Sequence, residues 1–193
     1  MLSKINIKSI IISHVKTLRN STSPDVCWSD FIVFYIIPFV FALGLSIKFD
    51  ITESFVNGVV TAASIFAGLL LNLLVLVYTV LSRQRPTPPD QNSKNRREIF
   101  EKILTETFSN ISYSILISVV LVATCLLFYI KGGYFPTGNR LLILFLIFQL
   151  IITLLMILKR IHSLFENELT EERDKNKTTS QSEEEDSPRN PLN

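Results

Sequence analysis

Few side chains in this sequence could do chemistry, and their spacing fits no catalytic or metal-binding arrangement. The chain holds two histidines, His14 and His162, and two cysteines, Cys27 and Cys125. The histidines lie near the ends of apolar runs without metal-ligand spacing, and two isolated cysteines make no disulfide framework. A glycine-rich phosphate loop and a nucleophile elbow are also missing from the sequence. We therefore expect no catalytic residue, no cofactor and no metal site, and we do not expect an enzyme.

A second set of side chains is suited to helix packing. Small or polar residues recur every three or four positions in one apolar run, which places them on one helix face: Asn57, Thr61, Ser64, Gly68 and Asn72. In lipid, small residues let two backbones approach, and Asn or Thr side chains can hydrogen-bond across helices. Two interpretations stay open: this face packs within its own chain, or it forms an oligomer seam or a pore lining.

Two shorter stripes of the same kind follow later in the chain. They comprise Asn110, Ser114 and Ser118 in one run, and Gln149, Thr153 and Met156 in the next. Three stripes on three helices would be explained by one shared polar interior, with the faces rich in Leu, Ile and Phe directed to lipid.

The elements that carry these stripes are long apolar runs. A bilayer core of ~30 Å needs about 20 apolar residues of helix, and four stretches qualify: Phe31–Ile47, Ser54–Ser82, Thr107–Ile130 and Leu141–Leu158. Hydrophobic residues make up 48% of the chain, and the mean hydropathy is +0.36. The sequence thus predicts an all-α, polytopic membrane protein with four transmembrane helices. Pro38 removes a helix hydrogen bond and predicts a kink in the first span.

The distribution of charge predicts the topology. Most basic residues fall in the N-terminal arm, in the loop between the second and third spans, and after the fourth span: Lys4, Lys8, Lys16, Arg19, Arg83, Arg85, Lys94, Arg96, Arg97, Lys102, Lys159, Arg160, Arg173, Lys175 and Lys177. Lys48, Lys131 and Arg140 fall on the other side. The positive-inside rule therefore places both termini in the cytoplasm.

The N-terminal residues 1–20 form a predicted amphipathic interfacial helix. Ile7, Ile10, Ile11, Val15 and Leu18 share one face. Lys4 and Lys8 lie largely on another, and Trp28 is placed to anchor at the lipid headgroups. The helix is expected either to lie on anionic lipid or to pack on the cytosolic base of its own chain.

The third and fourth spans are expected to extend into the cytosol. Pro86, Pro88 and Pro89 forbid a continuous helix before Ser93, but no breaker lies between Lys94 and Ile130. The predicted bundle is 28–165 with helical extensions at 93–108 and 159–170, which pack antiparallel as a short stalk. The composition of 171–193 is that of a disordered charged tail.

The membrane part, roughly residues 25–165, resembles the small four-span membrane subunits of bacterial anti-phage defence systems, the Kiwa membrane subunit in particular. The resemblance rests on Trp-Ser-Asp-Phe (Trp28–Phe31) before an aromatic, proline-containing first span. It also rests on Ala-Ser-Ile-Phe-Ala-Gly-Leu-Leu-Leu-Asn (Ala63–Asn72) in the second span. It implies a bacterial inner-membrane, oligomeric sensor coupled to a cytosolic effector that acts on phage nucleic acid.

The expected function is that of a sensor or scaffold that recruits or controls a soluble cytosolic effector. The expected partners are membrane lipids, further copies of the chain (a tetramer is one candidate state) and the effector, without direct nucleic-acid binding. Charged rims govern partner choice, so the effector is expected at the first extension: Arg96, Arg97, Glu98, Glu101 and Lys102. The alternative is a small pore-forming or membrane-depolarising protein.

Overall fold

A computed structural model describes residues 7–17, 32–48, 50–82, 91–130 and 137–185, and every regular element within these ranges is helical. The all-α prediction is therefore confirmed for this part of the chain. In chain order the elements are α1 (Ile7–Thr17), the π-helical turn η2 (Ile32–Ile36), α3 (Ile37–Lys48), α4 (Glu53–Ser82), α5 (Gln91–Ile130) and α6 (Thr137–Glu185).

Three of these helices are long and apolar enough to cross a membrane, namely α4, α5 and α6. The chain is thus membrane-embedded by the length and composition of its helices. The first predicted span is a shorter apolar helix, Ile32–Lys48, which is about 25 Å long at ~1.5 Å per residue.

The irregular start of this shorter helix coincides with its proline. The π-helical turn η2 ends at Ile36, and Pro38 is the second residue of α3. Since Pro38 has no backbone N–H, it cannot bond the carbonyl of Phe34, and the hydrogen-bond pattern changes there. The irregularity lies where the sequence predicts a kink.

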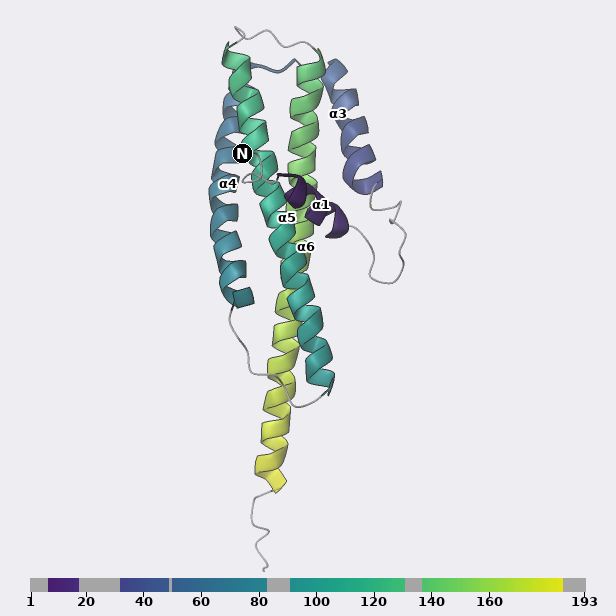
Figure 1. The fold of residues 1–193 in the computed structure, drawn as a ribbon, viewed down its shortest axis with the longest axis vertical. Coiled ribbons are helices and arrows are strands. Elements are labelled where there is room, and N and C mark those ends of the chain that lie inside the picture. The colour runs from purple at the N-terminus through teal and green to yellow at the C-terminus, as the bar shows by residue number, and fades with distance from the viewer. Residues whose placement is uncertain (1–6, 18–31, 49, 83–90, 131–136, 186–193) are drawn as a thin grey trace, which may run out of the picture.

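Helix α5 lies between α4 and α6 and holds the bundle together (Figure 1). Helix α4 buries residues seven apart, Val56, Ala63, Leu70 and Val77, as antiparallel helices in left-handed packing do. Two apolar clusters result. One cluster contains Val56 and Ala63 of α4 together with residues of α5 and α6. The other contains Leu70 and Val77 of α4, again with residues of α5 and α6.

The chain segment before α4 is tied to the start of α6. Thr52 caps α4, since its hydroxyl accepts a hydrogen bond from the backbone N–H of Phe55 at 3.3 Å. Asp50 forms an ion pair with Arg140 at 2.5 Å between N and O. The C-terminal end of α3 and the N-termini of α4 and α6 therefore meet at one end of the bundle (Figure 1).

At the opposite end α5 and α6 run on past α4 (Figure 1). Helix α5 begins at Gln91, two residues before the predicted cap Ser93. Phe100 and Leu104 of α5 pack in the same cluster as Ile161 and Leu164 of α6. The ends of α5 and α6 that run past α4 thus pack side by side.

The end of α6 differs from the prediction of a disordered tail from residue 171. The helix continues to Glu185, and residues 186–193 lie outside the described part. A physical reason is at hand: the segment 171–185 contains no Pro or Gly, so it holds neither of the two residue types that break helices most strongly. Low hydrophobicity alone led the sequence interpretation to disorder.

Candidate functional site

Within the described part of the chain, the polar face that the sequence predicts on α4 lies outside the buried core. Every one of its members is exposed: Asn57, Thr61, Ser64, Gly68 and Asn72. The face lies on the side of α4 away from the buried row described above. The Thr61 hydroxyl donates to the backbone carbonyl of Asn57 at 2.8 Å, a bond within one helix turn.

The glycine at the centre of this face is not required by the fold of one chain. A Cβ atom built on Gly68 would meet no atom within 4 Å. The described part of the chain therefore gives no support to packing of the α4 face inside its own bundle, and the interpretation as an oligomer seam or a pore lining stays open.

The stripes of α5 and α6, in contrast, face the interior. Asn110, Ser114, Ser118 and Thr153 are 0% exposed, and Gln149 is 1% exposed. The hydroxyls of Ser118 and Thr153 donate to the backbone carbonyls one turn before them, at 2.9 and 2.7 Å. The predicted shared interior therefore exists between two helices instead of three, and Met156 is only half-buried at its margin.

This buried polar line does not cross the bundle. Beyond Ser118, toward the Asp50–Arg140 end, the buried side chains of α5 and α6 include Leu121, Cys125 and Ile143, while Ser46 of α3 is a buried polar side chain near that end. In the described part of the chain, the buried polar line of α5 therefore ends at Ser118.

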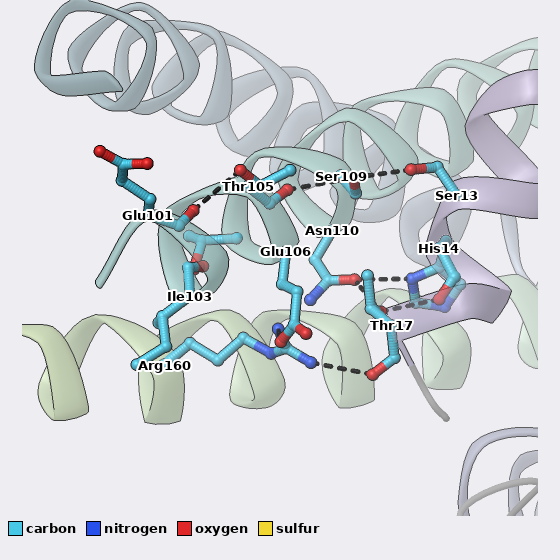
Figure 2. A network of polar contacts seen from close by, with 11 residues as sticks. Ser13, His14, Thr17, Glu101, Ile103, Thr105, Glu106, Ser109, Asn110 and Arg160 are labelled. Atoms are coloured by element: carbon cyan, nitrogen blue, oxygen red, sulfur yellow. Dashed lines mark hydrogen bonds and ion pairs between the residues drawn. The ribbon is translucent and has the colours of Figure 1, made fainter. Parts of the chain in front are cut away.

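At its other end the buried polar line meets helix α1, which crosses α5 and α6 near their middle (Figures 1 and 2). The polar contacts of α1 with α5 and α6 are called the junction here. Ser13 and Ser109 share a hydrogen bond between hydroxyls at 2.8 Å. The Nδ1 atom of His14 lies 2.9 Å from Oδ1 of Asn110. One turn of α1 is thus joined to one turn of α5 by two polar contacts.

Thr17 links the same junction to α6. Its hydroxyl lies 2.9 Å from Oδ1 of Asn110 and 2.7 Å from its own helix's carbonyl at His14, and its one proton serves one acceptor at a time. Arg160 of α6 donates to the carbonyl of Thr17 at 3.1 Å and forms an ion pair with Glu106 (Figure 2). The side chains of this ion pair are 16% and 27% exposed, so the charges are partly removed from solvent.

His14 is fully enclosed in the junction, as is Asn110. It is 0% exposed, and its ring stacks on Tyr113 with centroids 3.8 Å apart. Burial lowers the pKa of His14 to about 4, with a smaller lowering from Arg160 that the Asn110 hydrogen bond opposes. Because the Asn110 oxygen is an acceptor, the neutral ring carries its proton on Nδ1.

Several side-chain atoms in and beside this junction are buried without a hydrogen-bond partner in the described part of the chain. They are Nε2 of His14, Nδ2 of Asn110, Oγ of Ser114 and Oε1 of Gln149. An unsatisfied buried polar atom costs about 1–3 kcal/mol, so such a group in a folded protein calls for an explanation.

The sequence interpretation missed this junction because its members look unremarkable alone. His14 ends an apolar patch, and Glu106 and Arg160 look like ordinary boundary charges. The available signal was the spacing of Ser13, His14 and Thr17, which interrupt the apolar face of the N-terminal helix with polar side chains on one side.

The predicted partner-binding residues lie on α5 near its N-terminus, apart from this junction. Arg97 and Glu101 form an exposed ion pair at 2.8 Å, and Glu98 and Lys102 are exposed. The Arg96 side chain lies outside the described part. Of the predicted interface residues, Lys8 is exposed on α1, and Lys4 and Trp28 lie outside the described residues.

The backbones of α4 and α6 do not approach closely in the described part, and a groove of about 410 Å³ lies between the two helices. Its lining is apolar, with Val59, Ala62 and Phe66 from α4 facing Ile147 and Ile151 from α6. It holds no side chain that could orient a polar substrate.

The described residues contain no group of three or more His, Cys, Asp or Glu that could hold a metal ion. Comparison with protein-family models, curated proteins and solved structures finds no match to the chain.

Proposed function

We propose that the protein is an oligomeric four-span membrane scaffold or sensor that assembles through α4 and recruits or controls a soluble effector at its cytosolic helices. The resemblance to Kiwa membrane subunits extends this proposal to anti-phage defence at the bacterial inner membrane. The contacts of α4 support the assembly, and the extended ends of α5 and α6 support the recruitment.

The observation that carries the proposal is the exposed polar face of α4. In a bilayer, a helix face with Asn, Thr, Ser and Gly gains little from contact with lipid chains, whereas a second helix offers close packing and hydrogen-bond partners. Since the fold of one chain leaves this face uncovered, a second copy of α4 is its natural partner. The lipid-facing alternative would leave Asn72 in hydrocarbon.

The direct test is Gly68→Leu. A Leu side chain at this position fits the single chain, because nothing lies within 4 Å of the added Cβ. It would collide only with a partner helix, at a cost of ~1–3 kcal/mol per contact. We expect the native mass of the purified complex to fall to that of the single chain.

Gly44→Leu is the matched control. Gly44 also lies in an apolar helix, α3, with open space around its Cβ. The two variants gain the same side chain and the same helix propensity. A full-size complex in Gly68→Leu, or an equal loss in Gly44→Leu, would remove α4 as the seam.

The four-span arrangement with both termini in the cytoplasm has its own test. It requires Ile32–Lys48 to cross the membrane beside α6, with which α3 packs. Fusion of alkaline phosphatase at Gly133 should give an active enzyme, and fusion at Asn92 should not, because the basic residues concentrate on the Asn92 side. High activity of the Asn92 fusion would overturn this topology and the cytosolic effector site with it.

The alternative of a pore keeps one specific observation in its favour, the polar side chains of the α4 face. Since the buried polar line of α5 ends at Ser118, a conducting path would have to run between chains. Ion flux through liposomes containing the full chain, abolished by Gly68→Leu but not by Gly44→Leu, would favour the pore over the scaffold.

A further inference from the structure

Helix α1 is attached to the bundle by its polar side and by Ile10, which packs against the apolar cluster, while the rest of its apolar side is exposed. Ser13, His14 and Thr17 make the contacts with α5, while Ile7, Ile11, Ile12 and Val15 are 39% to 54% exposed. In a membrane interface such side chains contact lipid. The apolar contacts with lipid would persist if α1 left the bundle, so docking rests on the polar contacts and on the packing of Ile10.

Among those contacts, the one at His14 depends on protonation. In the docked state Nδ1–H donates to Asn110, and Nε2 is buried without a partner in the described part of the chain. A second proton on Nε2 would place a charge with no acceptor in a site that is 0% exposed. Burying an unpaired charge is among the most costly changes in a protein interior.

The neighbouring groups do not remove this cost. On α5 the ring faces neutral Tyr113, and Tyr35 of η2 lies beside that tyrosine. Arg160 of α6 adds a like charge. Glu106, the nearest carboxylate in the junction, is engaged by Arg160 (Figure 2).

We propose that His14 makes α1 an acid-sensitive latch, so that a second proton on its ring releases α1 from α5 and α6 while the apolar face of α1 stays on the lipid surface. Release withdraws the Thr17 carbonyl from Arg160 and uncovers Ser109 and Asn110. The state of α1 is thereby passed to the two helices that extend beyond the bundle. This latch does not depend on the α4 seam.

The direction in which pH changes the docking of α1 follows from the pKa of His14 in the docked and in the released state. Docking holds the pKa of His14 at about 4, and release returns it to the ordinary 6.5. A lowered pKa means that the docked state binds protons less readily. Docking is therefore at full strength above pH 6.5 and weakens progressively as the pH falls from 6.5 to 4. At pH 5 the docking equilibrium constant is smaller by about 30-fold.

The experiment measures how often position 109 becomes accessible in the full chain in lipid nanodiscs. Ser109→Cys is introduced with Cys27→Ser and Cys125→Ala, and its labelling rate by a small uncharged disulfide reagent is recorded. Ser109 is 9% exposed beneath Ser13, whereas Thr105, one turn away, is exposed. Thr105→Cys in the same background gives the reference rate at each pH, which corrects for thiol ionisation.

We expect the ratio of the two rates to rise about 30-fold from pH 7.5 to pH 5. His14→Asn retains a donor toward Asn110 but cannot take up a proton, so its ratio should not change with pH. A constant ratio in the parent, or an equal rise in His14→Asn, overturns the latch.

If His14→Asn is already open at pH 7.5, Asn110→Asp decides the matter. A carboxylate at position 110 would stabilise the doubly protonated ring of His14, so the rise at pH 5 should shrink severalfold. An undiminished rise in Asn110→Asp overturns the proposal, because a group other than His14 would then open the site.

Discussion

The polar stripes of α4 and α5 use similar side chains at similar spacings. Yet the α4 stripe lies on the outside of the bundle, whereas the α5 stripe lies inside it. On α4 the stripe is exposed, and the buried row is apolar from Val56 to Val77. On α5 the stripe is itself the buried row, from Asn110 to Ser118. The same pattern thus serves a surface in one helix and an interior in the other.

The difference shows how buried polar groups are accommodated in an apolar bundle. A serine or threonine hydroxyl bonds a carbonyl of its own helix, as Ser118 and Thr153 do. An amide side chain finds too few hydrogen-bond partners within its own helix, and Asn110 obtains its contacts from α1. Asn72 on the exposed face of α4 has the same need in lipid, which a second chain could meet.

The difference between the two stripes is tested most directly by the same substitution, Ser to Leu, made once on the buried face of α5 and once on the exposed face of α4. Ser118→Leu adds a bulky side chain at a site that is 0% exposed, whereas Ser64→Leu adds it at an exposed site. We expect Ser118→Leu to lower the free energy of unfolding by ~1–3 kcal/mol or more, since the interior is close-packed. Ser64→Leu should stay within about 0.5 kcal/mol of the parent.

Both variants are compared by thermal unfolding in a detergent that keeps each chain monomeric. Monomers are required because Ser64→Leu is also expected to disturb the seam between chains. Equal destabilisation of the two variants would show that the α4 stripe is packed within its own chain after all.

The α1 junction allows a second, smaller contrast between two charges of one ion pair. Arg160 contacts both Glu106 and the Thr17 carbonyl, whereas the contact of Glu106 in this junction is its ion pair with Arg160. Arg160→Met leaves a partly buried carboxylate without its cation and should cost ~1–3 kcal/mol. Glu106→Gln keeps an acceptor for Arg160 and should cost about 1 kcal/mol or less. Unfolding free energies of both single variants and the double variant measure the coupling.

A larger loss in Glu106→Gln than in Arg160→Met would contradict this ranking. It would mean that the negative charge, and not the bridge to α1, holds the junction together.

The smallest effect on the bundle is expected at the end of α5 beyond the polar stripe. Arg96→Glu with Arg97→Glu removes the exposed pair of Arg97 with Glu101, which is worth about 0.5 kcal/mol. The fold should survive, and a soluble effector bound there should be lost, because charge reversal on a rim changes partner choice. Pull-down from the native host in moderate salt measures the loss.

Lys48→Glu is the matched control, because Lys48 is exposed at the opposite end of the bundle. Retention of the partner by the double variant would exclude this part of α5 as the docking site. The C-terminal part of α6 would then be the next segment to truncate.

The sequence by itself determined the helical class and the membrane environment. Runs without charges and with helical periodicity are local properties, and lipid admits few other structures for them. It also predicted the continuous helix through Lys94 and the irregularity near Pro38, because both depend on residues within a few positions. It misplaced the end of α6, where low hydrophobicity was weighed above the absence of helix breakers.

Only the tertiary structure decided which stripe is inside. A helical period shows that Asn57 and Gly68, or Asn110 and Ser118, share a face, but the direction of that face depends on the neighbouring helices. The junction of His14 with Asn110 joins residues 96 positions apart. No local pattern encodes such a contact, because it arises from the packing angle at which α1 meets α5 and α6.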